Sequence, residues 1–162
     1  MSRIIVFILT ILLTFFPDNV SLLGLYQDAI YPGEQVITER VITSVKNGDV
    51  EAIEEMMSPY IKNNHENLSE DIEGLINTIE GEILKAFWYS GSHDSVKKDY
   101  DSYESYRTWQ IKFETDVSDY KLHVTWVRAN TNKPDMVGMS SLSLSDMEYN
   151  LLDEVYININ NT

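Results

Sequence analysis

Cysteine is absent from this chain of 162 residues. Disulfide bonds, thiolate nucleophiles and thiolate metal sites are therefore excluded, and stability has to come from the packing of apolar side chains. The sequence also lacks a glycine-rich phosphate-binding loop and the Gly-x-Ser-x-Gly turn of serine hydrolases. Nucleotide binding and serine hydrolysis consequently have no support, and we expect no cofactor.

Positive charge is scarce, because 12 lysines and arginines stand against 26 aspartates and glutamates and give a formal net charge of −14. A protein with such a negative field repels phosphate backbones and anionic lipid headgroups. We therefore expect no nucleic-acid partner, and contact with a membrane only through the N-terminal segment. Asp99, Asp101 and Glu104 do not follow the spacing of a calcium-binding EF-hand loop, so we interpret them as solvated.

The apolar run at the N-terminus, residues 4–16, is too short to cross a bilayer comfortably, since that takes about 20 residues. With Arg3 before it, the run has the basic start and the apolar centre of a secretory signal. Residues 22–24, Leu-Leu-Gly, are similar to the end of a lipoprotein signal. Leu25 stands where the lipidated cysteine would be, which excludes the standard lipid anchor.

Two fates of residues 1–24 remain open. They are a signal peptide that is cleaved after Gly24, or an N-terminal anchor whose apolar run is extended by residues 20–25. Both predict an extracytoplasmic protein, either secreted or attached to the cell membrane by this segment.

The rest of the chain holds enough apolar material for one core and one domain. Its first helical stripe consists of Ile37, Val41 and Val45. Asn47-Gly48 suits the left-handed residue that ends a helix, and Asp49 then serves as the N-cap of the next helix. The predicted helices cover about residues 34–46, 49–57 and 69–79.

From Gly81 onward the apolar period changes to two, which is typical of strands. The first strand, about residues 83–89, is apolar on both faces, so we expect it at the centre of the sheet. The polar residues 91–104 are interpreted as a turn and a weak strand. Three further strands are predicted at about residues 109–117, 120–126 and 136–144.

The order of helix, Asn47-Gly48-Asp49 turn, helix, helix and antiparallel strands resembles the nuclear transport factor 2-like superfamily, also grouped as cystatin-like. The resemblance covers residues 34–146. It implies an α+β fold in which three N-terminal helices pack on a strongly curved antiparallel sheet of about four strands, so that the domain is cone-shaped. More narrowly, residues 46–57 and 81–88 resemble an uncharacterised family of Firmicutes secreted proteins and lipoproteins whose domain has no assigned function.

An acidic tail, residues 147–162, follows the region of resemblance. Val155, Ile157 and Ile159 alternate as in an edge strand, whereas the asparagines at the end favour a frayed terminus. We expect the tail to be partly disordered, above all past Tyr156.

Three tryptophans, Trp88, Trp109 and Trp126, fall on predicted strands, and Tyr89 follows the first of them. If they face one cavity, these four residues form a ligand-binding pocket for a flat apolar molecule or a sugar. If they fill the core, they close the cone instead, because large aromatic side chains are mostly buried. Both interpretations remain open.

The resemblance also implies where catalysis would occur, since isomerases and dehydratases of the superfamily hold an acid-base Asp or His, often with a Tyr, deep in the cone. The candidates are His93, Asp94 and Tyr89. His93 and Asp94 lie in polar sequence, so we interpret them as exposed and assign no catalytic residue. The histidines at positions 65, 93 and 123 are on separate elements and lack metal-ligand spacing, so we expect no zinc site.

These observations predict a non-enzymatic, exported domain that binds a small molecule or a protein at the cell envelope. The outward face of its sheet, with Lys112, Lys121 and His123, is a candidate surface for a homodimer. Two alternatives remain: a small isomerase- or dehydratase-like enzyme with an acid-base residue in the cone, and a membrane-anchored scaffold subunit of a secretion or conjugation machine.

Overall fold

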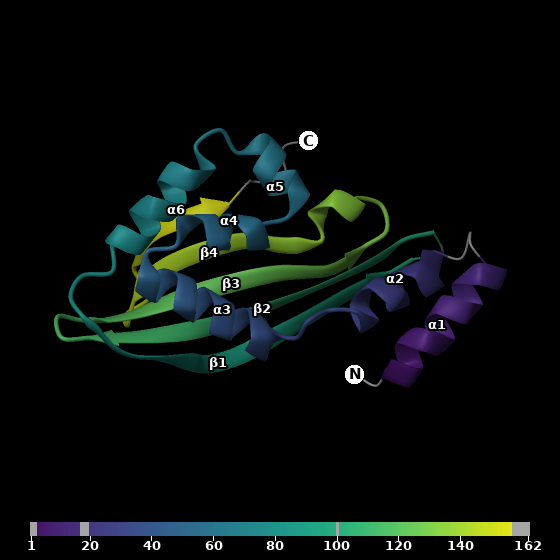
Figure 1. The fold of residues 1–162 in the computed structure, drawn as a ribbon, viewed down its shortest axis with the longest axis horizontal. Helices are drawn as coiled ribbons and strands as arrows, with labels where there is room; N and C mark the ends of the chain where they lie inside the picture. Colours follow the sequence, from purple (N-terminus) through teal and green to yellow (C-terminus); the bar gives the residue numbers. More distant parts are fainter. Residues whose placement is uncertain (1–2, 17–19, 100, 157–162) are drawn as a thin grey trace.

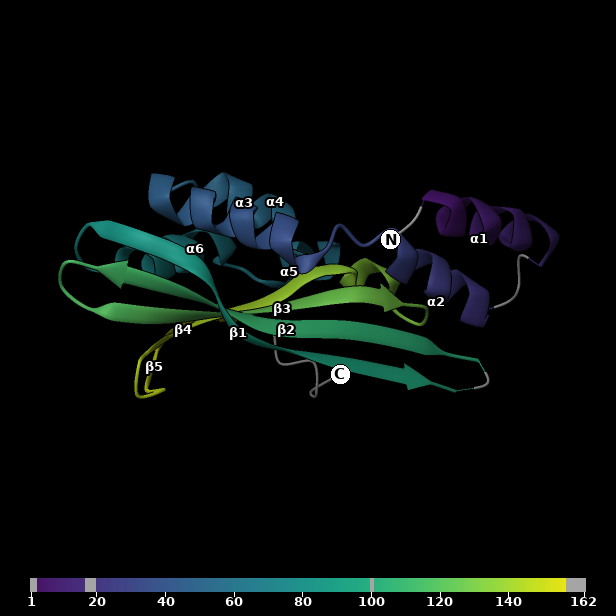
Figure 2. The ribbon, with the colours of Figure 1, turned by 90° about the horizontal axis from the view of Figure 1, so that it is seen from below.

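A computed structural model describes residues 3–16, 20–99 and 101–156 of the chain (Figure 1). Within these ranges the fold is α+β, with helices on one side of a five-stranded antiparallel sheet whose strands lie in the order β1 to β5 (Figure 2). The helices are α1 (Arg3–Phe15), α2 (Val20–Ala29), α3 (Glu34–Asn47), α4 (Val50–Met56), α5 (Pro59–Asn64), α6 (Leu68–Asn77) and the 3-10 helix η1 (Pro134–Met136). The strands are β1 (Ile83–Lys98), β2 (Tyr103–Thr115), β3 (Asp119–Asn130), β4 (Gly138–Asp146) and β5 (Leu151–Tyr156).

The joint between α3 and α4 forms as the sequence predicts. Gly48 adopts a left-handed conformation with a φ of 64°, and its N–H donates to the carbonyls of Ser44 and Val45. Asp49 caps α4, because its carboxylate accepts a hydrogen bond from the N–H of Ala52 at 3.0 Å. Glycine has no Cβ to clash in this conformation, so the two helices can meet with little intervening chain.

At Ser58-Pro59 the sequence predicts only the end of a helix, whereas the structure has a further helix, α5, that begins there. The Oγ of Ser58 accepts a hydrogen bond from the N–H of Ile61 at 3.3 Å. Proline is tolerated at the first position of a helix, since the N–H that it lacks would have no partner within the helix. The third predicted helix is α6, which ends at Asn77.

The first strand differs most from expectation. β1 continues for 16 residues, through the segment for which the sequence predicts a turn. It lies at the edge of the sheet and not at its centre, since β2 is its only strand neighbour in the described part of the chain. Its apolar residues on both faces reflect exposure at this edge, where Phe87 and Trp88 are 39% and 47% exposed. The pairing with β2 shifts register between Ile83 and Lys85, between Trp88 and Ser90, and between Ser90 and His93.

The acidic tail supplies a fifth strand, which resolves the choice between an edge strand and a frayed end for residues 151–156. Val155 of β5 pairs with Leu142 of β4, and both side chains are fully buried. The preceding turn is ordered by Asp146, whose Oδ1 accepts hydrogen bonds from the N–H groups of Glu148 and Asn150. Residues 157–162, for which disorder is predicted, lie outside the described part of the chain.

The core lies between the helices and the side of the sheet that they cover (Figure 2). Trp109, Ile111 and Phe113 alternate toward this side along β2, and all three are fully buried. Burying each such side chain is worth about 1.5–3 kcal/mol. The core residues that α3 contributes are Ile37, Val41 and Val45.

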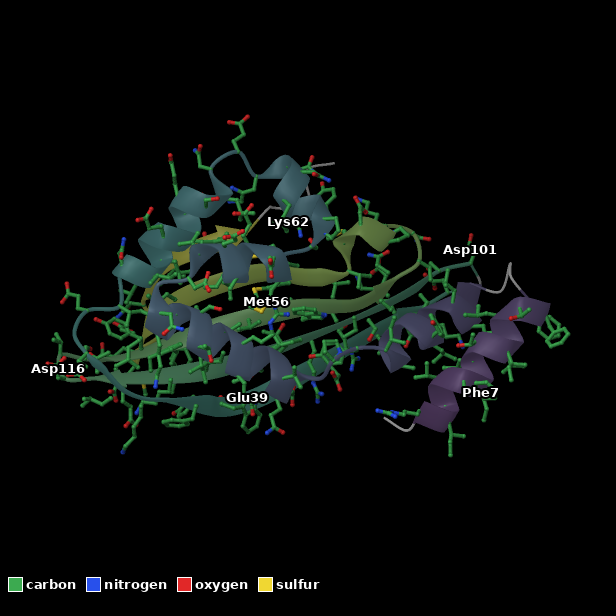
Figure 3. All side chains as sticks on the ribbon, viewed as in Figure 1. Phe7, Glu39, Met56, Lys62, Asp101 and Asp116 are labelled. Atoms are coloured by element: carbon green, nitrogen blue, oxygen red, sulfur yellow. The ribbon has the colours of Figure 1, made fainter. Side chains whose placement is uncertain are left out.

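Two helices precede the predicted domain. α2 contacts β2 and β3, where Ala29 is buried, and α1 contacts α2. α1 has no buried residue, and Phe7 points away from the sheet (Figure 3). No helix in the described ranges is both long enough and apolar enough to span a membrane. The predicted cleavage point after Gly24 falls within α2.

Candidate functional site

A groove of about 440 Å³ runs between α3 and the edge strand β1. This volume lies in the range of about 300–1,000 Å³ that is usual for small-molecule sites. The lining residues on α3 recur at intervals of three and four, so they form one side of the helix. Figure 3 shows Glu39 on the side of α3 that borders β1. The lining consists of Glu34, Gln35, Thr38, Glu39 and Ile42 from α3 and Ala86, Phe87 and Trp88 from β1.

Trp88 is the largest side chain that lines the groove. It lies opposite Ile111 in the ladder, and Ala86 lies opposite Phe113, so these side chains share the face that the helices cover. Ile111 and Phe113 are fully buried, whereas Trp88 is 47% exposed because β1 is at the edge. An indole left open in this way provides a flat surface on which a ligand can stack.

Thr38 and Trp109 close the groove on the side of the core. The Nε1 of Trp109 donates a hydrogen bond to the Oγ1 of Thr38 at 2.8 Å, and both side chains are buried. This bond satisfies the indole N–H inside the protein and fixes α3 over β2. Trp109 is therefore a core residue that supports the groove from behind.

Four charged side chains meet near the start of α3, and we call Glu34, Asp94, Arg107 and Arg128 the arginine–carboxylate cluster. The Nε of Arg107 lies 3.0 Å from the Oε2 of Glu34 and 3.1 Å from the Oδ1 of Asp94. The Nη1 of Arg128 lies 3.5 Å from the same Oδ1. The guanidinium of Arg128 also donates to the Oγ of Ser105. Since the side chains of Arg107 and Arg128 are only 25% and 12% exposed, water screens these pairs only in part.

Tyr31, in the loop between α2 and α3, packs on this cluster. Its ring centroid lies 6.1 Å from that of Trp126 and 5.8 Å from the guanidinium carbon of Arg128. Its hydroxyl is buried and has no hydrogen-bond partner in the described ranges. Burial, and next the negative charge of Glu34, hold the pKa of Tyr31 above its usual range. The hydroxyl therefore stays protonated at neutral pH.

The structure separates the four aromatic residues of the predicted pocket. Trp88 lines the groove, Trp109 fills the core, and Trp126 packs on the loop before α3. Tyr89 follows Trp88 in the strand and points to the opposite face, where the Nζ of Lys121 lies 5.8 Å from its ring centroid. They do not share one cavity, because strand alternation sends neighbouring residues to opposite faces.

The residues considered for catalysis lie in β1 and not in a turn. His93 pairs with Thr108, and Asp94 pairs with Arg107, along the ladder between β1 and β2. The side chain of His93 is outside the described part of the structure. Asp94 belongs to the arginine–carboxylate cluster, so two guanidinium groups compensate its charge. Among the described residues, no three His, Asp or Glu side chains gather as a metal site would require.

On the outer face of the sheet, a lysine is enclosed by the turn between β4 and β5. Lys121 is 2% exposed, and its Nζ donates to the carbonyl of Met147 at 2.9 Å. The same Nζ lies 3.3 Å from the ring centroid of Tyr149, which has a positive φ of 66°. Nearby, burial and next the charge of Lys121 lower the pKa of His123. The turn between β4 and β5 therefore holds the ammonium group of Lys121 in place on the outer face of the sheet.

The sequence prediction includes neither Tyr31 nor the two arginines of the cluster. The arginines do have a signal, because Arg107 is in phase with Trp109 on β2 and Arg128 is in phase with Trp126 on β3. A charged residue in phase with the buried face of a strand needs a partner inside the fold, which points to an internal ion pair. Tyr31 comes from an irregular loop and has no such signal.

A family model described as "Domain of unknown function (DUF5104)" matches residues 40–149. The matched range includes Trp88 and three members of the arginine–carboxylate cluster, whereas Glu34 and Glu39 precede it. No curated protein matches the chain.

Proposed function

Because the chain belongs to the DUF5104 family, whose domain has no known function, we propose a function from the geometry of the groove. The domain is non-enzymatic and binds a small molecule or a segment of a protein in the groove between α3 and β1. The observation that carries this proposal is Trp88, a half-exposed indole on the wall of a groove large enough for a small molecule. The polar groups of Gln35 and Glu39 on the facing helix can orient what binds there.

The core supports binding over isomerase or dehydratase chemistry. Such chemistry needs an acid-base residue inside the cone, and within the described ranges no aspartate, glutamate or histidine is among the buried residues. Asp94, one of the catalytic candidates, lies within ion-pair distance of Arg107 and Arg128. Both guanidinium groups already contact this carboxylate, which leaves it less free to contact a substrate.

The proposal extends to the superfamily and the location of the protein. The order of α3, α4, α6 and a single antiparallel sheet supports a nuclear transport factor 2-like fold. Export to the cell envelope is supported by the signal-like residues 4–16 and by α1, which buries none of its side chains in the domain. If cleavage follows Gly24, the second half of α2 stays on the domain. The intact mass of the exported protein separates a cleaved signal from the anchor that the scaffold alternative needs.

We also propose that the outer face of the sheet forms a homodimer, through different side chains from those first considered. Lys112 already pairs with Glu114 and Asp119 at 2.9 and 2.8 Å, and Lys121 is enclosed. The exposed apolar surface on this face comes from side chains that are 39–57% exposed. These are Tyr89, next to Lys121, and Leu151, which pairs with Ser145 opposite Lys121. Sedimentation equilibrium tests this proposal, and a monomer at all accessible concentrations would contradict it.

The test of the binding function uses amide chemical shifts and tryptophan fluorescence during a screen of chemically varied ligands. A ligand of the groove should shift amides of α3 and β1, and it should alter the emission of Trp88. Trp88→Leu should abolish the response, whereas Trp126→Phe, the matched change outside the groove, should leave it intact. If no compound in the screen perturbs α3 and β1, the proposed binding function is wrong.

A further inference from the structure

The groove combines negative charge with aromatic surface. Its described lining contains two carboxylates, those of Glu34 and Glu39, and no lysine or arginine. Trp88 adds an indole that is half exposed. Resting on the proposed binding function, we propose that the ligand is an organic cation, a molecule that carries an ammonium group on an apolar body.

The two carboxylates differ in their freedom to accept such a ligand. The Oε2 of Glu34 is buried and lies 3.0 Å from the Nε of Arg107, so Glu34 already faces a cation of the protein. Glu39 is exposed, and in the described part of the chain its carboxylate accepts a single side-chain hydrogen bond, from the Nε2 of Gln35 at 3.3 Å. Glu39 is therefore the carboxylate that receives the ammonium group, whereas Arg107 compensates the charge of Glu34.

The remaining lining suits the body of such a ligand. Ile42 and Ala86 supply apolar surface next to Trp88. Among aromatic side chains, tryptophan attracts a cation over its face most strongly, because its ring carries the largest negative quadrupole. An ammonium group near the indole and near Glu39 is therefore held by two independent attractions, while the apolar body leaves water.

Anionic ligands of similar shape are disfavoured by the same residues. The two arginines near the groove, Arg107 and Arg128, are already engaged by Glu34, Asp94 and Ser105. The net charge of −14 repels anions at a distance and steers cations toward the protein. The charge of the ligand, and not only its shape, thus decides binding.

Three probes with the same phenylethyl body and different charge test this inference. They are 2-phenylethylammonium, 2-phenylethanol and 3-phenylpropanoate. Amide shifts of α3 and β1 and calorimetry give the affinity of each for the intact exported protein. We expect the cation to bind about tenfold more tightly than the alcohol, because the attraction of the ammonium group to the indole and to Glu39 should be worth about one factor of ten in affinity. The anion should bind most weakly, and added salt should weaken only the cation.

Variants assign the effect to named side chains. Glu39→Gln should weaken the ammonium probe about tenfold and leave the affinity for 2-phenylethanol unchanged. Glu73→Gln removes an exposed carboxylate from α6, outside the groove, and should change neither. Trp88→Phe should retain part of the affinity and Trp88→Leu should lose it, with circular dichroism to confirm that each variant folds.

The outcomes separate this inference from the proposed function. If the three probes bind the groove equally well and depend on Trp88, the choice of a cation is wrong and the binding function stands. If Glu39→Gln and Glu73→Gln have the same effect, the assignment to Glu39 is overturned. If none of the probes binds, the cation inference fails, and the broader ligand screen described above then decides the binding function by itself.

Discussion

Thr38 and Trp109 join the third helix to the second strand through a hydrogen bond of 2.8 Å between two buried side chains. They are separated by 71 positions in sequence. The bond connects the wall of the groove to the deepest layer of the core, so the shape of the groove depends on the stability of the domain.

Replacing Thr38 by Val should therefore destabilise the protein by about 1–3 kcal/mol, because the shape is kept while the buried indole N–H loses its acceptor. Urea denaturation measures the change. Thr43→Val is the matched control on the same helix, since Thr43 is exposed and its Oγ1 donates to the carbonyl of Glu39 in the preceding turn. Equal stability of the two variants would show that the bond between Thr38 and Trp109 contributes nothing.

Arg107→Met should cost about 1–3 kcal/mol, because it leaves Glu34 and Asp94 without the guanidinium between them. The loss stays below that of a fully buried ion pair, since the cluster is partly exposed. Thermal and urea unfolding give the value, and the double variant with Glu34→Gln should cost less than the sum of the single changes. Arg40→Met serves as control, because its pair with Glu55 at 3.7 Å is exposed and is expected to matter by less than about 1 kcal/mol.

Lys121→Met should raise the pKa of His123 toward its ordinary value without restoring it, since burial is the larger cause of the depression and the charge of Lys121 the second. An NMR titration of the imidazole follows this change, with Lys85→Met, which alters an exposed lysine, as control. An unchanged titration in Lys121→Met would contradict the assignment.

A depressed pKa in the folded state also fixes the pH dependence of stability. The unfolded chain binds the proton of His123 more readily, so stability should fall as the pH drops below the ordinary pKa of histidine, about 6.5. His123→Gln should flatten this part of the stability curve between about pH 7.5 and 5.5, measured by urea unfolding. A wild-type curve and a His123→Gln curve of the same slope would refute the prediction.

Gly138→Ala should be more damaging than Gly48→Ala. Gly138 has a φ of 131°, and an added Cβ would approach the backbone of Ser58 to 3.0 Å, where the N–H of Ser58 donates to the carbonyl of Met139. Gly48 has a φ of 64° and open space around it, so alanine there costs only about 1–2 kcal/mol of backbone strain. Midpoints of thermal unfolding compare the two, and a smaller loss at position 138 would contradict the close approach.

The sequence predicts the structure correctly where neighbouring residues alone determine it. The turn at Gly48 and Asp49, the stripe of α3 and the alternation along β2 follow from a handful of neighbouring residues, and each forms as predicted. The length and position of β1 depend on pairing with a strand that comes later in the chain. For that reason the sequence predicts a turn and a weak strand for its polar half and a central strand for its apolar half.

The candidate site shows the same division. Trp88 is identified from sequence, but its separation from Trp109 and Trp126 depends on the edge position of β1 and on the register of the sheet. The groove also needs α3 beside β1, a contact between elements about 50 residues apart that periodicity does not encode. Only the phase of Arg107 and Arg128 carries a signal for the charged end of the site.

The register shifts in the pairing of β1 with β2 affect the tendency of the protein to aggregate through this edge strand. A strand of sixteen residues with an open flank would ordinarily template the addition of a strand from another copy and seed fibrils. Here regular pairing is confined to two short runs, from Lys85 to Trp88 and from His93 to Lys98. A strand from a second copy that paired with the edge of β1 would lose register after a few residues. The edge that leaves Trp88 open to a ligand is therefore a poor template for polymerisation.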